Sequence, residues 1–452
     1  MVSILQHVRA AVQAIRTTGA WALMAGVMLT AVSSSSGVEA SPLVLSAEPA
    51  TISDQEWALY RNRFVDGSGR VLDVDNGGQS HSEGQGYGMI FAVEANDPAT
   101  FDRIWRFTKD NLQIRSDSLL AWRWRPETAP HVTDINNATD GDILVAYALL
   151  RAAMVWDQRE YAYEADRIIG DIGRKLVAEV GGRPVLRPAA FGFDETSGNR
   201  GPVVNLSYYI FSAFPLFEIV RPEFPWQEIA AAGFTLTEEA RHGRRGLVPD
   251  WISVSARGTA IANGFDAKSS YDAVRIPLYM ALAGAPGEHF ASFDMAWNVH
   301  GGGHPIDYML RTDSVLAPMN DPGYRLISAL AACANRGAPI PAQLQTFHPT
   351  TYFASSLQLL GLVAVRRNYV ECIDTPSVII ATSRSVPAAV APRPYYDVPR
   401  PSPRDPRTTT VVAPQRPTAT RAPAPIRAAF HRQSAQSFSD RIMQKSWLPV
   451  TR

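Results

Sequence analysis

The sequence has few cysteines, no net charge and no apolar run of membrane-spanning length. Its 452 residues include two cysteines, Cys333 and Cys372, and its acidic and basic residues balance at 43 each. So few cysteines exclude a small disulfide scaffold, and no Cys/His cluster has the spacing of a zinc site. The two cysteines are compatible with one disulfide or with two buried free thiols.

The neutral total hides two regions of opposite charge. Residues 41–383 carry 29 Lys and Arg against 39 Asp and Glu, a net charge of −10, while residues 384–452 carry 12 against 3, a net charge of +9. An acidic body argues against nucleic acid as the main ligand, because phosphate binding needs a basic surface. The 343 residues of this body exceed a typical domain but suit a large single barrel.

The N-terminus has the pattern of a secretion signal over residues 1–40. Arg9 and Arg16 precede an apolar run over 20–32, and small residues at 38–40 suit cleavage. The run is shorter than the roughly 20 residues of a membrane-spanning helix, although an uncleaved anchor is the alternative. We therefore expect a periplasmic or secreted protein with no membrane span after cleavage.

The C-terminus, residues 384–452, differs from the body in composition. Its segment 384–427 contains 11 prolines and 8 arginines. Such a composition cannot bury a core, so it predicts a disordered or polyproline-like tail. The domain organisation expected is a signal over 1–40, a catalytic body over 41–383 and this tail.

The body has the pattern of a long series of helices, which predicts an all-α fold. Two Gly/Pro/Asn-rich stretches, 183–204 and 246–266, predict short β-hairpin insertions. Paired helices with long connections suggest a double ring of helices, with an irregular orthogonal bundle as the alternative. The eleven helices expected are 53–64, 83–95, 98–113, 141–157, 160–180, 205–219, 226–242, 270–283, 287–298, 322–336 and 350–367.

Three acidic residues stand at the starts of predicted helices: Glu83, Asp140 and Asp272. Glu83 lies among three glycines, before the apolar run 89–92, a setting that raises a carboxyl pKa and lets backbone and ligand approach closely. The simpler interpretations are helix caps for Glu83 and Asp140, and for Asp272 an ion pair with Arg275.

Aromatic residues accompany these acids. Trp122 and Trp124 precede the Asp140 segment, and Tyr208 and Tyr271 lie at predicted helix starts. Aromatic faces beside carboxylates suit sugar rings, whose C–H groups stack while their hydroxyls take polar partners. A single tryptophan is better explained as a core residue, whereas several in loops near acids favour a carbohydrate cleft.

Three further patterns imitate metal sites. Asp140-Gly-Asp142 and His300-Gly-Gly-Gly-His304 both lack a further ligand, and 73–77 departs from a calcium loop in its glycine position and its missing distal Glu. We interpret them as a helix start, a loop and a turn, and predict no metal.

Three segments resemble the motifs of glycoside hydrolase family 8. Residues 138–156, with Ala138-Thr-Asp140-Gly-Asp142 followed by apolar residues and Trp156, resemble the family signature; 82–89 resembles the general-acid segment; and Tyr271-Asp-Ala-x-Arg275 resembles the general-base segment. The resemblance covers residues 50–370 and is closest to the periplasmic cellulases that accompany bacterial cellulose synthase.

This resemblance implies an (α/α)₆ barrel, which needs one helix more than the eleven expected. It also implies that Glu83 is the general acid, Asp272 the general base and Asp140 a residue that holds the sugar at the point of cleavage. Asn205-Leu206-Ser207-Tyr208 resembles the family's Asn-Pro-Ser-Tyr, with leucine in place of proline. The substrate-binding set expected is Asp140, Trp122, Trp124, Asn205, Tyr208, Tyr271 and Arg275, without metal or organic cofactor.

The function implied is inverting endo-hydrolysis of β-1,4-glucan, with the cellulose synthase complex as a further expected partner. One alternative keeps the hydrolase but exchanges the substrate for xylan, mixed-linkage glucan or chitosan. Another is a non-catalytic glucan-binding component of the cellulose export machinery.

Overall fold

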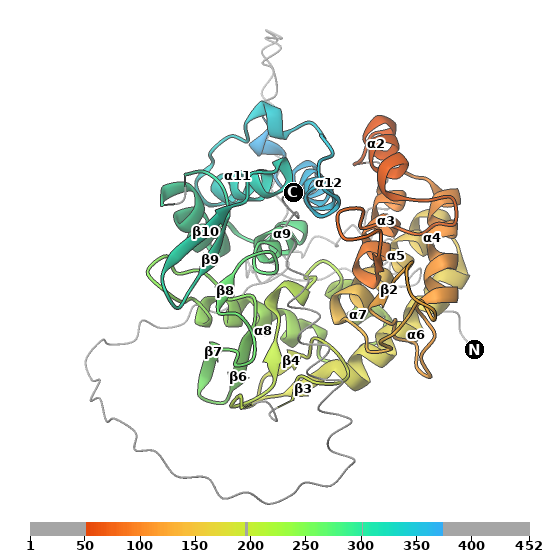
Figure 1. The fold of residues 1–452 in the computed structure, drawn as a ribbon, viewed down its shortest axis with the longest axis horizontal. Coiled ribbons are helices and arrows are strands. Elements are labelled where there is room, and N and C mark those ends of the chain that lie inside the picture. The colour runs from red at the N-terminus through yellow and green to blue at the C-terminus, as the bar shows by residue number, and fades with distance from the viewer. Residues whose placement is uncertain (1–50, 195–197, 301, 374–452) are drawn as a thin grey trace, which may run out of the picture.

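The structure, a computed structural model, describes residues 51–194, 198–300 and 302–373. The predicted signal peptide and the predicted Pro/Arg-rich tail lie outside these residues. The described part is mostly helical, as predicted, with small antiparallel sheets at its periphery (Figure 1). Its eleven α-helices are α2 (Asp54–Phe64), α3 (Ser82–Glu94), α4 (Pro98–Asn111), α5 (Thr139–Trp156), α6 (Arg159–Leu176), α7 (Phe214–Val220), α8 (Trp226–Glu239), α9 (Arg275–Leu282), α10 (Ala291–Asp294), α11 (Pro322–Arg336) and α12 (Tyr352–Asn368).

Helix starts follow from local capping chemistry. The Ser53 side chain accepts from the amide of Glu56 while the Glu56 side chain accepts from the amide of Ser53, a capping box that begins α2. Asp97 accepts from the amide of Thr100 and precedes Pro98 at the first position of α4. These caps satisfy amide groups that no helix-internal carbonyl can reach.

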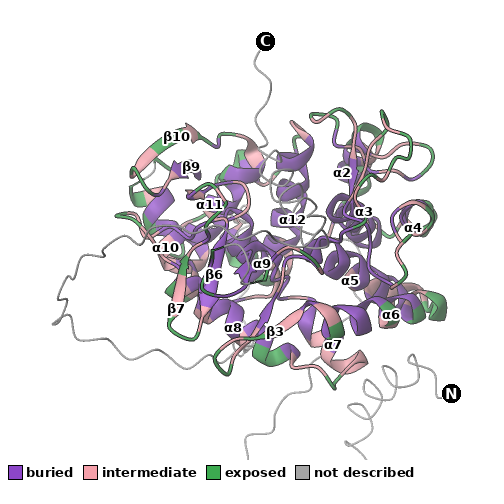
Figure 2. Cartoon of the chain, turned by 60° about the horizontal axis from the view of Figure 1, so that its bottom comes forward, coloured by how far each residue is buried: buried purple, intermediate pink, exposed green. Residues whose placement is uncertain are grey.

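An inner layer of helices closes into a ring. Helix α3 packs on α5, α5 on the short 3₁₀ segment η2 (Leu206–Tyr208), η2 on α9, α9 on α12, and α12 returns to α3. Every residue of α3 is buried, as are residues 352–365 of α12, because these helices have neighbours on all sides (Figure 2). This ring brings helix starts from distant parts of the chain to one centre.

Outer helices cover this ring. Helix α4 packs on α3, α6 on α5, and α11 on α12 and α9. Apolar residues of α6 recur on its inner side, with Ile168, Ile169 and Ile172 fully buried, while most of its charged residues are at least partly exposed (Figure 2). The charged residues Glu164 and Asp171 are buried. The arrangement is a double ring of helices, as predicted.

The strands form four small antiparallel sheets among the described residues. Their orders are β1-β2, β3-β4, β5-β6-β7 and β10-β9-β8. The strands are β1 (Ser80–His81), β2 (Arg123–Trp124), β3 (Val177–Glu179), β4 (Pro184–Leu186), β5 (Val203–Val204), β6 (Ile252–Ser255), β7 (Gly258–Ile261), β8 (Lys268–Ser269), β9 (Ile306–Met309) and β10 (Ser314–Pro318).

Strand positions only partly match the prediction. The stretch 246–266 holds the hairpin β6-β7 as predicted, but 183–204 is not a hairpin, because β4 pairs with β3 and β5 pairs with β6. The sheet of β8, β9 and β10 was not predicted from the sequence.

Two predicted helices begin later than expected. The predicted helix 205–219 divides into η2 and α7, because Pro215 has no N–H and is tolerated only in a first helical turn. The predicted helix 270–283 begins at Arg275, so Asp272 lies in a turn and not in the helix. Pro277 lies within the first turn of α9, where a proline is again tolerated.

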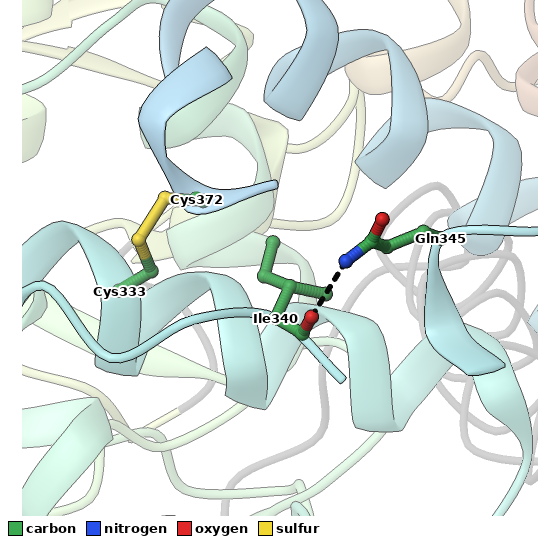
Figure 3. Close-up of a disulfide and its surroundings, with 4 residues drawn as sticks. All are labelled: Cys333, Ile340, Gln345 and Cys372. Carbon is green, nitrogen blue, oxygen red and sulfur yellow. Dashed lines mark hydrogen bonds between the residues drawn. A yellow bond between two sulfur atoms is a disulfide. The ribbon is translucent and has the colours of Figure 1, made fainter. Parts of the chain in front are cut away.

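A disulfide joins Cys333 of α11 to Cys372 beyond α12, and so decides between the two alternatives for these cysteines (Figure 3). The same corner is held by the amide of Ile340, which donates to the carbonyl of Cys372 at 2.9 Å. Gln345 Nε2 donates to the carbonyl of Ile340 at 2.7 Å (Figure 3). The disulfide therefore anchors the end of the described chain to the outer layer.

The first and last helices of the double ring contact each other. Arg366 of α12 forms an ion pair with Glu56 of α2 at 2.7 Å, and the hydroxyls of Tyr60 and Ser356 are 2.9 Å apart. None of the helices described here has both the length and the hydrophobicity of a membrane span.

Candidate active site

Three carboxyl groups converge on the guanidinium of Arg275. Nη1 of Arg275 contacts Oε1 of Glu83 and lies 3.1 Å from Oδ2 of Asp140, while Nη2 lies 2.5 Å from Oδ1 of Asp272. Glu83, Asp140 and Arg275 are at most 2% exposed, and the Asp272 side chain is 22% exposed. The structure thus brings together the three acids that the sequence singled out.

Arg275 keeps its positive charge in this centre. Burial alone would lower the pKa of Arg275, but the carboxylates, Glu83 first, raise this pKa well above its usual range. The predicted ion pair between Asp272 and Arg275 is present, but it is one of three. Arg275 is therefore the residue that joins α3, α5 and the turn before α9.

Glu83 lies in the first turn of α3, as predicted, but its surroundings are polar as well as apolar. Besides Arg275, the hydroxyl of Tyr87 donates to Oε1 of Glu83 at 3.0 Å, and the hydroxyls of Tyr87 and Tyr279 are 2.7 Å apart. Burial and the charge of Glu83 raise the pKa of Tyr87 well above its usual range, so this phenol stays protonated. The sequence analysis missed the roles of Tyr87 and Tyr279, although an i, i+4 spacing from Glu83 signals a contact on one helix face.

The glycines of this segment allow close packing between secondary-structure elements. A Cβ at Gly86 would lie 2.6 Å from Cβ of Leu144, and one at Gly88 would lie 2.7 Å from a methyl carbon of Val71. Gly141 of α5 meets the same segment from the other side, because a Cβ there would lie 2.0 Å from Oγ of Ser82. The expectation that these glycines admit a ligand is therefore replaced by a packing role.

Asp140 and Asp142 are two residues apart in α5, so their side chains point to nearly opposite sides of the helix. Asp140 faces Arg275, whereas Asp142 accepts from the amide of Leu120 at 2.8 Å and from Nδ2 of Asn137 at 2.7 Å. Burial without a cation in contact raises the pKa of Asp142 to about 8. Neither is the N-cap residue of α5, which is Ala138.

Tyr208 and Asn205 both come from the segment around η2. The Tyr208 ring is buried, with Cζ of Arg275 5.8 Å from its centroid, which places Tyr208 at the centre of the site. Asn205 Oδ1 accepts from the amide and hydroxyl of Ser207 at 3.0 and 2.7 Å. The Asn205 side chain therefore shapes the turn that carries Tyr208.

The other aromatic residues differ in exposure. Trp122 is 1% exposed, with Cζ of Arg123 4.2 Å from its ring centroid, so its face is covered. Trp124 is partly exposed between Arg70 and His131, and partly exposed Tyr271 packs against Tyr324. Arg70 and His131 lie 4.6 and 4.2 Å from the Trp124 ring, so its faces are also largely occupied, and only its partial exposure separates it from Trp122.

The metal-like patterns have other roles in the structure. In the segment 73–77 the amide of Asn76 donates to the carbonyl of Asp73 at 3.1 Å, which confirms a turn, and Oδ2 of Asp75 accepts from the amide of Tyr352. Nδ1 of His304 lies 3.1 Å from the carbonyl of Pro305. Within 51–194, 198–300 and 302–373, no three His, Cys, Asp or Glu side chains gather as a metal site would require.

Comparison with known proteins agrees with this arrangement. Residues 32–367 match the family model described as "Glycosyl hydrolases family 8". A probable endoglucanase of Novacetimonas hansenii is 38% identical over 317 residues, which covers 69% of this chain and 90% of that protein.

Two solved structures share the fold. An endo-β-1,4-glucanase from Acetobacter xylinum superimposes with a TM-score of 0.63 at 34% identity, over 70% of this chain and 98% of that one. A family 8 endoglucanase from Klebsiella pneumoniae gives a TM-score of 0.62 at 30% identity, over 69% and 99% of the two chains. The double ring of helices is an (α/α)₆ barrel, and the chain belongs to glycosyl hydrolase family 8.

Proposed function

We propose that this glycoside hydrolase is an inverting endo-β-1,4-glucanase. The observation that carries the proposal is the contact of one buried guanidinium, that of Arg275, with Glu83, Asp140 and Asp272. Two of these carboxyl groups, those of Glu83 and Asp272, lie in the segments that resemble the family's general-acid and general-base segments. The similarity to endoglucanases at 34–38% identity supports β-1,4-glucan as the substrate class.

Glu83 acts as the general acid in this proposal. Three carboxyl groups share the single positive charge of Arg275, so one of them can carry a proton. We assign this proton to Oε2 of Glu83, because Arg275 and Tyr87 both donate to Oε1. That proton passes to the glycosidic oxygen as the bond to the anomeric carbon breaks. The leaving sugar thus departs as a neutral alcohol.

Asp272 acts as the general base. It is the most exposed of the three acids, so water reaches it most readily. Its carboxylate takes a proton from a water that attacks the anomeric carbon from the face opposite Glu83. Inversion requires about 6.5–9.5 Å between the two carboxyl groups, which leaves room for this water.

Asp140 and Tyr208 hold the sugar at the point of cleavage. Both lie beside Arg275, which fixes their position relative to Glu83 and Asp272. A carboxylate that binds ring hydroxyls favours a distorted ring, which resembles the oxocarbenium-like transition state. The proposed reaction uses no metal or organic cofactor.

We also propose that the protein is exported and acts near cellulose synthesis. The support is the signal-like sequence at 1–40 and the similarity of the motifs to periplasmic cellulases beside bacterial cellulose synthase. The basic residues 384–452 would then contact the cellulose synthase complex. Co-purification with synthase subunits by the full chain, and its loss on truncation at 383, would test this partner.

Substitution of the two carboxyl groups tests the reaction. We expect E83Q and D272N each to lower the release of reducing ends from carboxymethyl-cellulose by about 10³-fold or more while the circular dichroism spectrum is retained. E127Q is the matched control, because Glu127 is 52% exposed and pairs with Arg125 at the surface. Near-normal turnover by E83Q or D272N would refute the assignment.

A glycan panel tests the substrate. Carboxymethyl-cellulose, xylan, mixed-linkage glucan and chitosan are compared, and the anomer formed first is identified by NMR. We expect fastest cleavage of β-1,4-glucan with initial release of the α-anomer. Fastest cleavage of another glycan would change the substrate, and binding of glucan without hydrolysis would favour a scaffold function.

A further inference from the structure

Asp250 is a carboxyl group beside the site that the reaction does not use directly. Its Oδ1 accepts from the amide of Ser270 at 2.7 Å and from the amide of Ala273 at 2.9 Å. Asp272 lies between these two amides in sequence. One oxygen atom of Asp250 therefore accepts hydrogen bonds from residues on both sides of Asp272 in the turn.

The turn that carries Asp272 lies outside α9, because Pro277 is tolerated only in a first helical turn and so fixes the helix start near Arg275. The pattern of 270–283 predicts one continuous helix, and the amide of Val274 already donates to the carbonyl of Ser270 at 3.0 Å, as a helix would require. The amides of Ser270 and Ala273 instead turn toward Asp250. Pro277 keeps α9 from extending by a turn, so loss of Asp250 instead leaves the amides of Ser270 and Ala273 without this acceptor and lets the turn that carries Asp272 shift.

Asp250 is itself held in place by a sheet. Its amide donates to the carbonyl of Lys268 at 2.8 Å, and Lys268 and Ser269 form β8, which pairs with β9. The support of the turn therefore runs from β9 through β8 to Asp250. The sheet of β8, β9 and β10, which lies outside the double ring, thus supports the turn.

Asp250 and Asp272 differ in the charges around them. Arg275 contacts Asp272, whereas the described residues show no cation in contact with Asp250. Burial first, and then the charges of Asp272 and Asp307, raise the pKa of Asp250 well above its usual range. A neutral Asp250 supports the turn without repelling the carboxylate of Asp272.

We propose that Asp250 is the positioning residue of the general base: it holds the 270–274 turn in the non-helical conformation that aims Asp272 at the catalytic centre. The inference rests on the proposed function, in which Asp272 activates water. Asp250 contacts the turn through the two backbone amides, so in this proposal it acts through Asp272.

Alanine and asparagine substitutions separate this role from others. D250A removes the acceptor, and we expect kcat on carboxymethyl-cellulose to fall about 10²-fold, the order of effect of a misplacement of about 1 Å, while KM stays near the wild-type value. D250N retains an amide oxygen for both donors and restores most of kcat. D266A is the matched control, because Asp266 is 62% exposed and pairs with Lys268 at the surface 3.6 Å away.

A double substitution tests whether Asp250 acts through Asp272. In a D272N background, D250A has no further effect on residual activity if positioning of Asp272 is its role. A purely structural role would lower the melting temperature and the yield, and its effect would multiply with that of D272N. Multiplying effects, wild-type kcat in D250A, or a D250N as slow as D250A would each overturn the inference.

A further variant covers the case in which D250A does not fold. D250E keeps the carboxyl group but carries it past the two amides, so the same fall in kcat is expected and wild-type kcat overturns the inference. Full activity of D272N would instead refute the proposed function itself. An inactive D272N beside a fully active D250E or D250A would refute only the role of Asp250.

Discussion

The two sides of the active site are built in different ways. Glu83 and Asp140 lie on neighbouring buried helices. Gly86 and Gly141 let α3 and α5 approach so closely that a Cβ at either glycine would overlap atoms of the facing helix. Asp272 lies on a turn outside any helix. This turn is held by hydrogen bonds from the amides of Ser270 and Ala273 to Asp250. We call these the helix side and the turn side of the site.

The difference matches the two chemical tasks. On the helix side, packing fixes the carboxyl group proposed to meet one glycosidic oxygen, and close-packed helices resist displacement. On the turn side, the carboxylate is proposed to meet a mobile water, and a turn leaves it partly exposed to solvent. Arg275 belongs to both sides, so it offers the strongest test of the comparison.

Removal of the Arg275 guanidinium is expected to have the largest effect. R275M leaves Glu83, Asp140 and Asp272 converging without a cation, and a broken buried pair costs about 3–5 kcal/mol in the free energy of unfolding. We also expect kcat to fall about 10²–10³-fold. Urea unfolding and reducing-end assays measure both effects, and an R275M that is stable and active would show that the two sides do not depend on this residue.

Removal of the disulfide tests a region outside both sides. C333A/C372A is expected to lower the free energy of unfolding by about 2–5 kcal/mol, because the bond closes a loop with a sequence separation of 39. Activity at 25 °C should stay at the wild-type level, since neither cysteine contacts the site. A large fall in kcat for folded C333A/C372A would contradict the separation of the outer layer from the chemistry.

G141A tests the helix side alone. The added Cβ would lie 2.0 Å from Oγ of Ser82 and 2.8 Å from the amide nitrogen of Glu83, so α3 must shift. We expect a loss of about 1–3 kcal/mol in the free energy of unfolding and a lower kcat. G67A is the control, because a Cβ there meets nothing within 4 Å, and equal behaviour of the two variants would contradict the packing role.

D97A tests the cap of an outer helix and is expected to have the smallest effect. Burial alone would raise the pKa of Asp97, but hydrogen bonds from Thr100, Trp57 and Arg61 outweigh it and lower this pKa to about 2. The folded state therefore favours the ionised form, so the stabilisation is complete above the unfolded pKa of about 3.9 and is lost as the pH falls through about 2.

We expect D97A to cost about 0.5–2 kcal/mol at pH 7 and progressively less below pH 4. Chemical unfolding of D97A and wild type at several pH values measures the difference. A difference that stays constant down to pH 2 would contradict the ionised cap.

The sequence predicted the helix side better than the turn side. Apolar periodicity and capping residues are local, so α3 and α5 were placed within two residues of their observed starts. The setting of Glu83 was less predictable, because its partner Arg275 comes from 192 residues further along the chain.

The turn side depends on contacts that sequence periodicity does not report. Ser269 pairs with Tyr308 in a sheet of short strands, and Asp250 reaches the turn from outside the predicted helix. Both interactions join residues that are distant in sequence, so the helical pattern of 270–283 carried no sign of them. The site roles of Glu83, Asp140 and Asp272 themselves stay predictions.

The contact between α2 and α12 has a consequence for the order of folding. Glu56 and Arg366 pair across 310 residues, so during synthesis the N-terminal helices leave the ribosome long before their last neighbour exists. Until α12 emerges, its contact surfaces on α2 and α3 stay uncovered. During this period the growing chain is exposed to aggregation or to chaperone binding. Completion of the barrel thus waits for α12, the last of the described α-helices to be translated.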